Sequence, residues 1–175
     1  MNKQMMFSNI EQVKSCREKI IRITNEKVEE LISKGTGIEF LRQVKFTQNG
    51  YDPLFEKPLN FIEQTNQTFT YLVSLLALER LFELYPNSSF RVDFGTSSGY
   101  DIESEDGSII CECFSATAPD SNQKLNKDVE RLFNNQSATK KYVIYYAEIP
   151  KEKHVDNIRS KYKDIEIITL SSLSI

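Results

Sequence analysis

The strongest strand pattern in the chain is the stretch Ser108-Ile-Ile-Cys-Glu-Cys-Phe-Ser115. Its apolar residues follow one another in the manner of a central strand of a β-sheet. Because side chains alternate along a strand, Glu112 is expected on the same face as Ile110 and Phe114, and the two cysteines on the other. A carboxylate in such a strand carries a large desolvation cost unless a partner balances its charge.

Further strand patterns lie on both sides of this stretch. Residues 90–94 alternate between apolar and polar side chains, and residues 100–103 are predicted to be extended. The Glu-Asp-Gly sequence at 105–107 is typical of a hairpin turn. Residues 141–148 are bulky and nearly continuously apolar, as in a central strand buried on both faces, and residues 165–170 are predicted as the last strand.

Helical patterns precede these strands. A capping box at residues 8–11 begins a helix that Gly35 and Gly37 are predicted to end. Residues 38–57 are predicted to be irregular or extended. Pro58 suits the first turn of a second helix, which is predicted to run to Tyr85. The second half of this helix is apolar nearly all round and is therefore expected to be buried.

The predicted fold class is α/β, with a mixed sheet of about five strands flanked by helices. Two further helices are predicted at about residues 118–133 and 151–162. Residues 1–57 are expected to form an N-terminal helix and an irregular extension packed on a core of residues 58–175. At 175 residues the chain fits a single domain overall.

Charge is distributed unevenly along the chain, whose net charge is −3. Residues 87–119 contain one basic and six acidic residues, which gives −5, whereas residues 120–163 contain ten basic and six acidic residues, which gives +4. An acidic stretch followed by a basic one suits a metal site beside a phosphate-binding surface. The alternative is that the two stretches form two solvated faces.

The chain has no segment that is expected to span a membrane. Its longest apolar run, residues 69–78, is too short, and the N-terminus lacks the apolar stretch of a signal peptide. Cys111 and Cys113 would share one face of a strand, which is a poor arrangement for a disulfide. Reduced core thiols and a cytoplasmic location are therefore predicted.

The order helix, three strands, helix, strand over residues 58–148 resembles the αβββαβ core of the PD-(D/E)XK, or restriction-endonuclease-like, nucleases. In that superfamily an Asp lies at or near the start of the second core strand and a (D/E)-x-K triplet on the third. Here Asp101 lies in the second predicted strand and Glu112 in the third, eleven positions later and across a tight hairpin. The resemblance covers a little over half of the chain.

This resemblance implies a divalent-metal site at Asp101 and Glu112. A Mg²⁺ (or Mn²⁺) ion bound by the two carboxylates, a backbone carbonyl and water would balance the charge of Glu112 in its apolar strand. The ion would polarise a phosphate and lower the pKa of a bound water for in-line attack.

The lysine of the family triplet is missing, because the sequence Glu112-Cys113-Phe114 has phenylalanine at that position. Some members of the superfamily take a lysine from the helix after the third strand, and that segment here is Asn122-Gln-Lys-Leu-Asn-Lys-Asp128. Lys124 or Lys127 is therefore expected to assist the attacking water, and Lys124 is preferred because it is nearer the start of the helix. The alternative is that both lysines are exposed residues on the flank of a helix.

Glu63 is a further candidate, since members of the superfamily often add a carboxylate from the helix before the three strands. Together with Asn60 and Gln67 it forms a polar cluster at the start of an otherwise apolar helix. The alternative is a first-turn carboxylate that interacts favourably with the helix dipole.

Three other features are given structural interpretations. Asp93 alternates with apolar neighbours and is predicted to be an exposed strand residue. Residues 95–99, Gly-Thr-Ser-Ser-Gly, are predicted to be a loop, and they lack the helix and lysine that follow the glycines of a P-loop. His154 is expected to be a surface histidine rather than a general base.

The resemblance implies a metal-dependent endonuclease acting on DNA, of the restriction or defence type. Such nucleases are often homodimers, because each protomer cuts one strand. The rival hypothesis is a catalytically inactive protein of the same fold that serves as a binding, immunity or assembly module, and Phe114 favours it. A third hypothesis is an unrelated α/β domain in which Glu112 is incidental.

Overall fold

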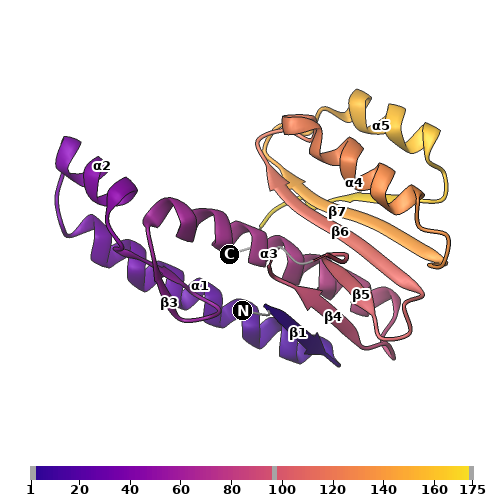
Figure 1. Ribbon diagram of the computed structural model, residues 1–175, viewed down its shortest axis with the longest axis horizontal. Helices are drawn as coiled ribbons and strands as arrows, with labels where there is room; N and C mark the ends of the chain where they lie inside the picture. Colours follow the sequence, from indigo (N-terminus) through magenta and orange to yellow (C-terminus); the bar gives the residue numbers. More distant parts are fainter. Residues whose placement is uncertain (1–2, 96–97, 174–175) are drawn as a thin grey trace.

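The computed structural model describes residues 3–95 and 98–173 of the 175-residue chain. In this part of the chain a six-stranded mixed sheet is flanked by helices, and a separate two-stranded hairpin lies apart from it (Figure 1). The predicted α/β class and mixed sheet are confirmed. The sheet has one strand more than the number of about five that the sequence predicts.

The sheet combines an antiparallel part and a parallel part. Its strands lie in the order β1 (Gln4–Phe7), β4 (Phe90–Asp93), β5 (Ile102–Ser104), β6 (Ile109–Ala116), β7 (Lys140–Ala147) and β8 (Glu166–Thr169). The pairs β1–β4, β4–β5 and β5–β6 are antiparallel. The pairs β6–β7 and β7–β8 are parallel. The carboxyl ends of β6, β7 and β8 therefore meet at one edge of the sheet, which is where the candidate site lies.

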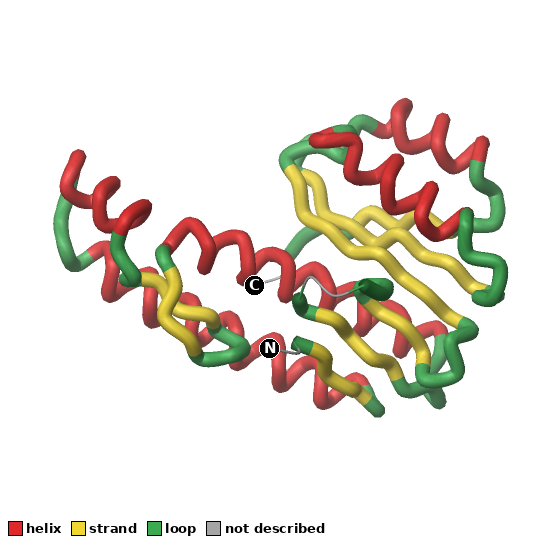
Figure 2. The backbone as a smooth tube through the Cα atoms, in the orientation of Figure 1, coloured by secondary structure: helices red, strands yellow, loops and turns green. Residues whose placement is uncertain are grey.

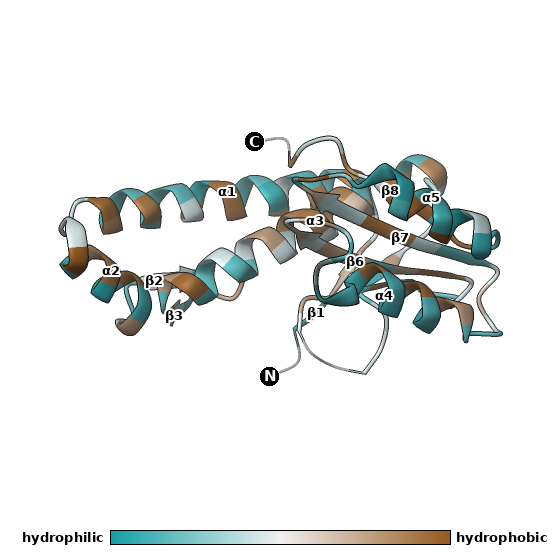
Figure 3. Cartoon of the chain, turned by 90° about the horizontal axis from the view of Figure 1, so that it is seen from above, coloured by the Kyte–Doolittle hydropathy of each residue, from teal (hydrophilic) through white to brown (hydrophobic). Residues whose placement is uncertain are grey.

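Helices cover the two faces of the sheet (Figure 2). The helices α1 (Ile10–Ile32) and α3 (Phe61–Leu84) pack together, and α3 contacts β6 and β7. On the other face, α4 (Lys124–Phe133) and α5 (Glu152–Lys161) cross over the parallel strands. In Figure 3 these two outer helices are mainly hydrophilic, whereas β7 beneath them is mainly hydrophobic.

The alternation predicted for the central strand is confirmed. Cys111 and Cys113 belong to the core between the sheet and α3, whereas Ile110 and Phe114 belong to the core beneath α4 and α5. Glu112 therefore points towards α4. The cysteines are free thiols, and their sulfur atoms lie 3.7 Å apart.

The prediction of an irregular or extended segment over residues 38–57 is wrong for residues 38–46, which are helical, and is confirmed for residues 47–57. The structure has a helix, α2 (Gly37–Phe46), followed by the hairpin of β2 (Gly50–Asp52) and β3 (Lys57–Leu59). None of the residues in α2 is buried, and Ile38 and Phe46 are 83% and 73% exposed. Ile38, Leu41 and Val44 do recur at helical spacing, but the pattern is short and follows two glycines that indicate the end of a helix.

The predicted start of the second helix is also wrong. Pro58 lies in β3, and α3 begins at Phe61 after the N-cap residue Asn60. The side-chain oxygen of Asn60 accepts a hydrogen bond from the backbone N–H of Glu63 at 2.9 Å. This cap satisfies a free donor of the first turn, and it places the helix start three positions after Pro58 rather than at it.

The N-terminal part of the chain also contributes directly to the core sheet. Residues of β1 pair antiparallel with β4, and Phe7 is fully packed in the core. A strand of only four residues has too short a pattern to be recognised before a long helix. Residues 1–57 therefore supply an edge strand as well as the helix α1 that packs on α3.

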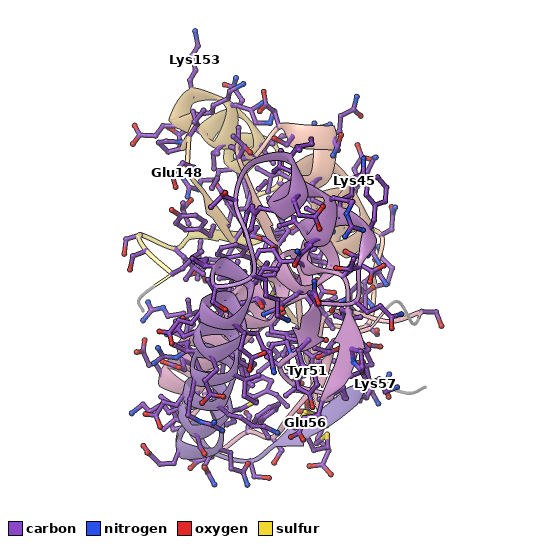
Figure 4. All side chains as sticks on the ribbon, turned by 90° about the vertical axis from the view of Figure 1, so that its left-hand side faces the viewer. Lys45, Tyr51, Glu56, Lys57, Glu148 and Lys153 are labelled. Carbon is purple, nitrogen blue, oxygen red and sulfur yellow. The ribbon has the colours of Figure 1, made fainter. Side chains whose placement is uncertain are left out.

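The helix α2 and the β2–β3 hairpin lie at the end of the molecule that is distant from α4 and α5 (Figure 1). Figure 4 views the chain from this end, with Lys45 of α2 and Tyr51 and Lys57 of the hairpin in front. The hairpin is fastened to α1 by an ion pair between Lys19 and Glu56 at 2.6 Å. No helix in residues 3–95 and 98–173 is long and apolar enough to cross a lipid bilayer.

Asp93 and the loop after it complete the antiparallel part. Asp93 ends β4 half-buried, accepts a hydrogen bond from the side chain of Gln4 at 3.1 Å, and accepts the N–H of Gly95 at 2.8 Å. These contacts suit a structural role at the end of a strand. The predicted loop over 95–99 includes residues 96 and 97, which lie outside the described residues.

A buried carboxylate joins the N-terminus to α3. Asp52 is 1% exposed, and its oxygens accept hydrogen bonds from Lys3 Nζ at 3.1 Å and from the hydroxyl of Tyr71 at 3.0 Å. The backbone N–H groups of Leu54 and Phe55 donate to it as well, at 3.1 and 3.0 Å. Burial acts to raise the pKa of Asp52, but the hydrogen bonds from Phe55, Lys3 and Leu54 outweigh it and lower that pKa.

We expect Asp52→Asn to destabilise the protein by about 3 kcal/mol at pH 7, because it leaves Lys3 without its carboxylate. A lowered folded-state pKa stabilises the protein above the unfolded-state pKa, and this contribution is lost as the pH falls through the folded-state value. The difference in stability between wild type and variant should therefore shrink below about pH 4. Urea denaturation at several pH values measures it, and Glu56→Gln, which breaks an exposed ion pair, serves as the control with little effect.

Candidate functional site

A cleft of about 790 Å³ opens at the carboxyl end of β6. Its floor is the end of β6 and the residues after it, from Cys113 to Thr117. Asp101, Lys124 at the start of α4, and Thr70 of α3 line its sides. The cleft thus brings together segments that are far apart in the sequence, at the edge where the parallel strands end.

The central acidic group beside this cleft is Glu112. It is 1% exposed in the middle of β6, and it faces α4. Arg131 Nη1 lies 2.7 Å from Glu112 Oε1, which makes an ion pair, but among the described residues no donor is aligned to form a hydrogen bond with that oxygen. Burial and the nearby charge of Asp101 raise the pKa of Glu112 to about 9, although Arg131 acts to lower it.

Asp101 lies directly across the strand pair from Glu112. The register pairs Ile102 with Cys111 and Glu103 with Ile110, so the next position of the ladder sets Asp101 opposite Glu112. Asp101 Oδ2 accepts a hydrogen bond from the backbone N–H of Cys113 at 2.7 Å, which fixes the carboxylate against β6. The tight hairpin at 105–107 is therefore what converts a spacing of eleven residues into a pair of neighbouring carboxylates.

A third buried carboxylate, Asp128, comes from α4. It is 4% exposed, and its Oδ1 accepts a hydrogen bond from Lys124 Nζ at 2.6 Å. Its other oxygen, Oδ2, has no hydrogen-bond partner among the described residues. Burial raises the pKa of Asp128 to about 6, even though Lys124 acts in the opposite direction. Asp128 therefore has unused capacity to bind a cation or a proton donor.

Lys124 contacts this acidic cluster, as preferred from the sequence. Burial acts to lower the pKa of Lys124, but its hydrogen bond to Asp128 and the charges of Asp128, Asp101 and Glu112 outweigh burial and raise that pKa. Its ammonium group lies 5.9 Å from the ring centre of Phe114, two residues after Glu112 in β6. The ammonium group of Lys124, on α4, thus lies over the ring of Phe114, on β6.

The other two predicted site residues are not brought into the cluster. Lys127 is exposed on α4 and does not line the cleft. Glu63 is exposed in the first turn of α3, whereas α3 lines the cleft through Thr70, seven residues or about 10 Å further along the helix axis. The first turn of α3 therefore lies away from the carboxylates, and Glu63 has the position of an ordinary first-turn helix residue.

Asp128 and Arg131 are the site residues that the sequence did not predict. They lie four and seven residues after Lys124, so the three side chains share one side of α4. That spacing is visible in the sequence, but it also suits an exposed, charged helix face. Only the packing of α4 on the sheet reveals that Asp128 is buried.

The turn that forms the wall of the cleft has strained backbone geometry. Asn122 and Gln123, just before α4, have φ angles of +53° and +56°, a region that non-glycine residues rarely adopt. Asn122 lines the cleft. The turn is braced by an ion pair between Asp120 and Lys151 at 2.6 Å. Strain of this kind persists where surrounding contacts over-determine it, often beside functional sites.

Some of the remaining basic residues of the 120–163 stretch also lie at this edge of the sheet. Lys151 precedes α5, and Lys153 projects away from the first turn of that helix (Figure 4). His154, predicted to be a surface residue, is instead half-buried there, and its Nε2 has no hydrogen-bond partner among the described residues. Together with Glu152 and Asn157 these side chains line a separate pocket, and none of them lines the cleft.

The carboxylates form only a small set of ligands for a divalent ion. In the described part of the chain, no three His, Cys, Asp or Glu side chains are placed to hold a metal ion together. Mg²⁺ usually takes only one or two carboxylates and completes its shell with water and substrate phosphate. Asp101 and Glu112 meet that smaller requirement, and the oxygens of Glu112 and Asp128 that have no aligned hydrogen-bond donor among the described residues are acceptors that a hydrated ion could use.

Comparison of the chain with protein-family models, with curated proteins and with solved structures gave no match. The interpretation of the site therefore rests on its own contacts and burial. These contacts define a cluster of three carboxylates, one lysine and one arginine at the carboxyl end of a central strand.

We expect Glu112→Gln to remove a pH-dependent loss of stability in the metal-free protein. A folded-state pKa near 9 means that folding favours the protonated acid, so ionisation lowers stability as the pH rises from about 5 to about 9. Relative to the variant, the wild type should lose a few degrees of melting temperature over this range. Thermal unfolding in EDTA measures the difference, and a difference that does not change with pH would contradict the prediction.

Proposed function

We propose that this chain is a metal-dependent phosphodiesterase of the PD-(D/E)XK type, an endonuclease that acts on DNA in restriction or defence. The observation that carries the proposal is the pair of buried carboxylates, Glu112 and Asp128, each with an oxygen that has no aligned donor among the described residues. Glu112 lies opposite Asp101 and Asp128 is close enough to feel its charge, and Asp101 itself lines the cleft at the carboxyl end of β6. Buried acids without donors are costly unless a cation completes them.

In this proposal, Asp101 and Glu112 hold Mg²⁺ (or Mn²⁺), with water filling the remaining positions. The bound ion would supply Lewis-acid activation of a phosphate and of a water molecule. Asp101 is fixed for this role by the N–H of Cys113, and Glu112 by its place in the central strand. The two ligands thus belong to rigid elements that cannot shift independently.

Lys124 is proposed to orient the attacking water and to stabilise negative charge on the phosphate. It lines the cleft and is held by Asp128 at 2.6 Å. The bond to Asp128 keeps the lysine protonated, which suits electrostatic stabilisation of a phosphate rather than base catalysis. Asp128 then acts as the residue that positions Lys124 over Phe114.

DNA and a second protomer are proposed as partners. The cleft is large enough for a phosphodiester and its flanking sugars, and the carboxylate cluster beside it offers one proposed cutting site. Cutting both strands of a duplex would therefore need two protomers. The free thiols of Cys111 and Cys113 support a reducing compartment, and we propose the cytoplasm.

The alternative is a catalytically inactive protein of this fold that serves in binding, immunity or assembly. Two observations favour it: Phe114 replaces the family's lysine, and Arg131 already supplies a positive charge to Glu112 at 2.7 Å. In an inactive protein this ion pair would be a permanent part of the core. The two proposals differ in whether a divalent ion binds.

Metal binding is the first test. We expect Mn²⁺ to bind the wild type in calorimetry, and binding to disappear in the Asp101→Asn/Glu112→Gln double variant because both carboxylates are lost. Glu103→Gln, which removes a carboxylate on β5 that pairs with Arg91, should bind as the wild type does. Absence of Mn²⁺ binding in the wild type would reject the nuclease proposal in favour of the inactive module.

Nicking of supercoiled plasmid in Mg²⁺ tests the role of Lys124. Lys124→Met should lower the rate by about a hundredfold, because it removes the cation that faces the phosphate. Lys127→Met is the matched control on the same helix and should leave the rate unchanged, since Lys127 lies outside the cleft. Equal effects of the two substitutions would show that Lys124 has no special role.

A further inference from the structure

Arg131 connects both proposed metal ligands to α4. Its Nη1 faces Glu112 at 2.7 Å, and its Nη2 donates to the carbonyl oxygen of Gly99. The guanidinium carbon lies 5.0 Å from the ring centre of Tyr100. Gly99 and Tyr100 immediately precede Asp101, so one side chain holds the segment that carries Asp101 and also pairs with Glu112.

The contact with Glu112 is electrostatic rather than a well-formed salt bridge. Glu112 is 1% exposed, whereas the Arg131 side chain is 45% exposed. The oxygen that Arg131 faces is also the Glu112 oxygen that lacks an aligned hydrogen-bond donor. Arginine–carboxylate pairs usually form aligned, often two-fold, hydrogen bonds, so this pair forgoes most of the stabilisation that such a pair can have.

A guanidinium and a divalent ion cannot both sit favourably at the same carboxylate. Two positive groups within a few ångströms repel strongly when water is excluded, and a divalent ion doubles that repulsion. The half-exposed arginine can turn to solvent at low cost, whereas the buried glutamate cannot follow it. Metal binding therefore displaces the arginine.

We propose that Arg131 is a resident counter-ion for Glu112 that occupies the carboxylate while the metal is absent and gives way when Mg²⁺ binds. This inference rests on the proposed function and adds a positioning residue to it. Arg131 supplies a partner for Glu112 whenever that carboxyl is ionised in the metal-free protein. It also holds the segment that carries Asp101 through Gly99 and Tyr100. Its competition with the ion lowers metal affinity.

Removal of the competing charge should therefore tighten metal binding. Arg131→Gln is expected to raise the affinity for Mn²⁺ by about tenfold at constant pH. A metal ion carries two charges and a proton only one, so loss of Arg131 favours the metal even where the carboxylate also takes up a proton. Arg131→Lys, which keeps the charge, should bind Mn²⁺ as the wild type does.

Calorimetric titration with Mn²⁺ provides the test, with Arg91→Gln as the matched control. Arg91 is 49% exposed and pairs with a carboxylate on β5, so its loss should not change Mn²⁺ affinity. Arg131→Gln should also melt at a lower temperature than the wild type in EDTA, and saturating Mn²⁺ should restore the melting temperature. Mn²⁺ should therefore raise the melting temperature of Arg131→Gln by more than it raises that of the wild type, whereas equal rises would show that Arg131 has only a structural role.

The possible outcomes separate this inference from the function on which it rests. If the wild type binds Mn²⁺ and Arg131→Gln binds it equally or more weakly, the counter-ion role is overturned and the metal site stands. If neither protein binds Mn²⁺ and the ion restores no stability, the metal site itself is rejected. If Arg131→Gln is too unstable to titrate, the rise in its melting temperature on addition of Mn²⁺ is compared with the rise in the wild type. A larger rise in the variant supports the counter-ion role, and an equal or smaller rise overturns it.

Discussion

The burial of Glu112 in the central strand is the constraint on which the rest of this site depends. A carboxylate that is 1% exposed in an apolar strand must be neutralised by a proton, a basic side chain or a bound cation. The chain places Arg131 beside it, but two further acids, Asp101 and Asp128, surround the same position. Three acids face two bases, Lys124 and Arg131, so the three acids cannot all be ionised without an excess of negative charge, and the pKa of Glu112 is raised accordingly.

Three buried acids of this protein show how a structural carboxylate differs from a candidate functional one. Asp52 accepts hydrogen bonds from Lys3, Tyr71 and two backbone N–H groups, and these bonds lower its pKa. Glu112 and Asp128 each have an oxygen without an aligned donor among the described residues, and their pKa values are raised. Hydrogen bonds thus satisfy both oxygens of Asp52, whereas Glu112 and Asp128, beside the cleft, each keep one oxygen without an aligned donor among the described residues. That contrast, more than the presence of acids, supports a ligand-binding role for the cluster.

The elements that build the cluster are rigid, and the residues that could respond to a ligand are at its rim. Asp101 and Glu112 are cross-strand neighbours, and Asp128 lies on a helix packed against the sheet. Lys124 and Arg131, in contrast, are long side chains that are nearly half exposed. When a cation binds or leaves, the side chains of Lys124 and Arg131 can therefore move while the three carboxylates stay in place. Such an arrangement suits a site whose cation content changes during its function.

The sequence by itself determined the α/β class, the meander of β4, β5 and β6, the side of the sheet that Glu112 faces, and the candidates Asp101, Glu112 and Lys124. These follow from alternation, from a short hairpin and from helical spacing, which are local properties of the chain. The sequence did not reveal α2, β1 or the start of α3. The helix α2 is short and has no buried residue, its apolar pattern follows two glycines, and the four residues of β1 are too few to show a period. The helix α3 begins after its N-cap Asn60 rather than at Pro58. Only the tertiary structure decided that Asp128 and Arg131 join the cluster and that Glu63 and Lys127 do not. Burial depends on how α4 and α3 pack against the sheet, and residue spacing along a helix cannot report which of its charged sides the sheet will cover.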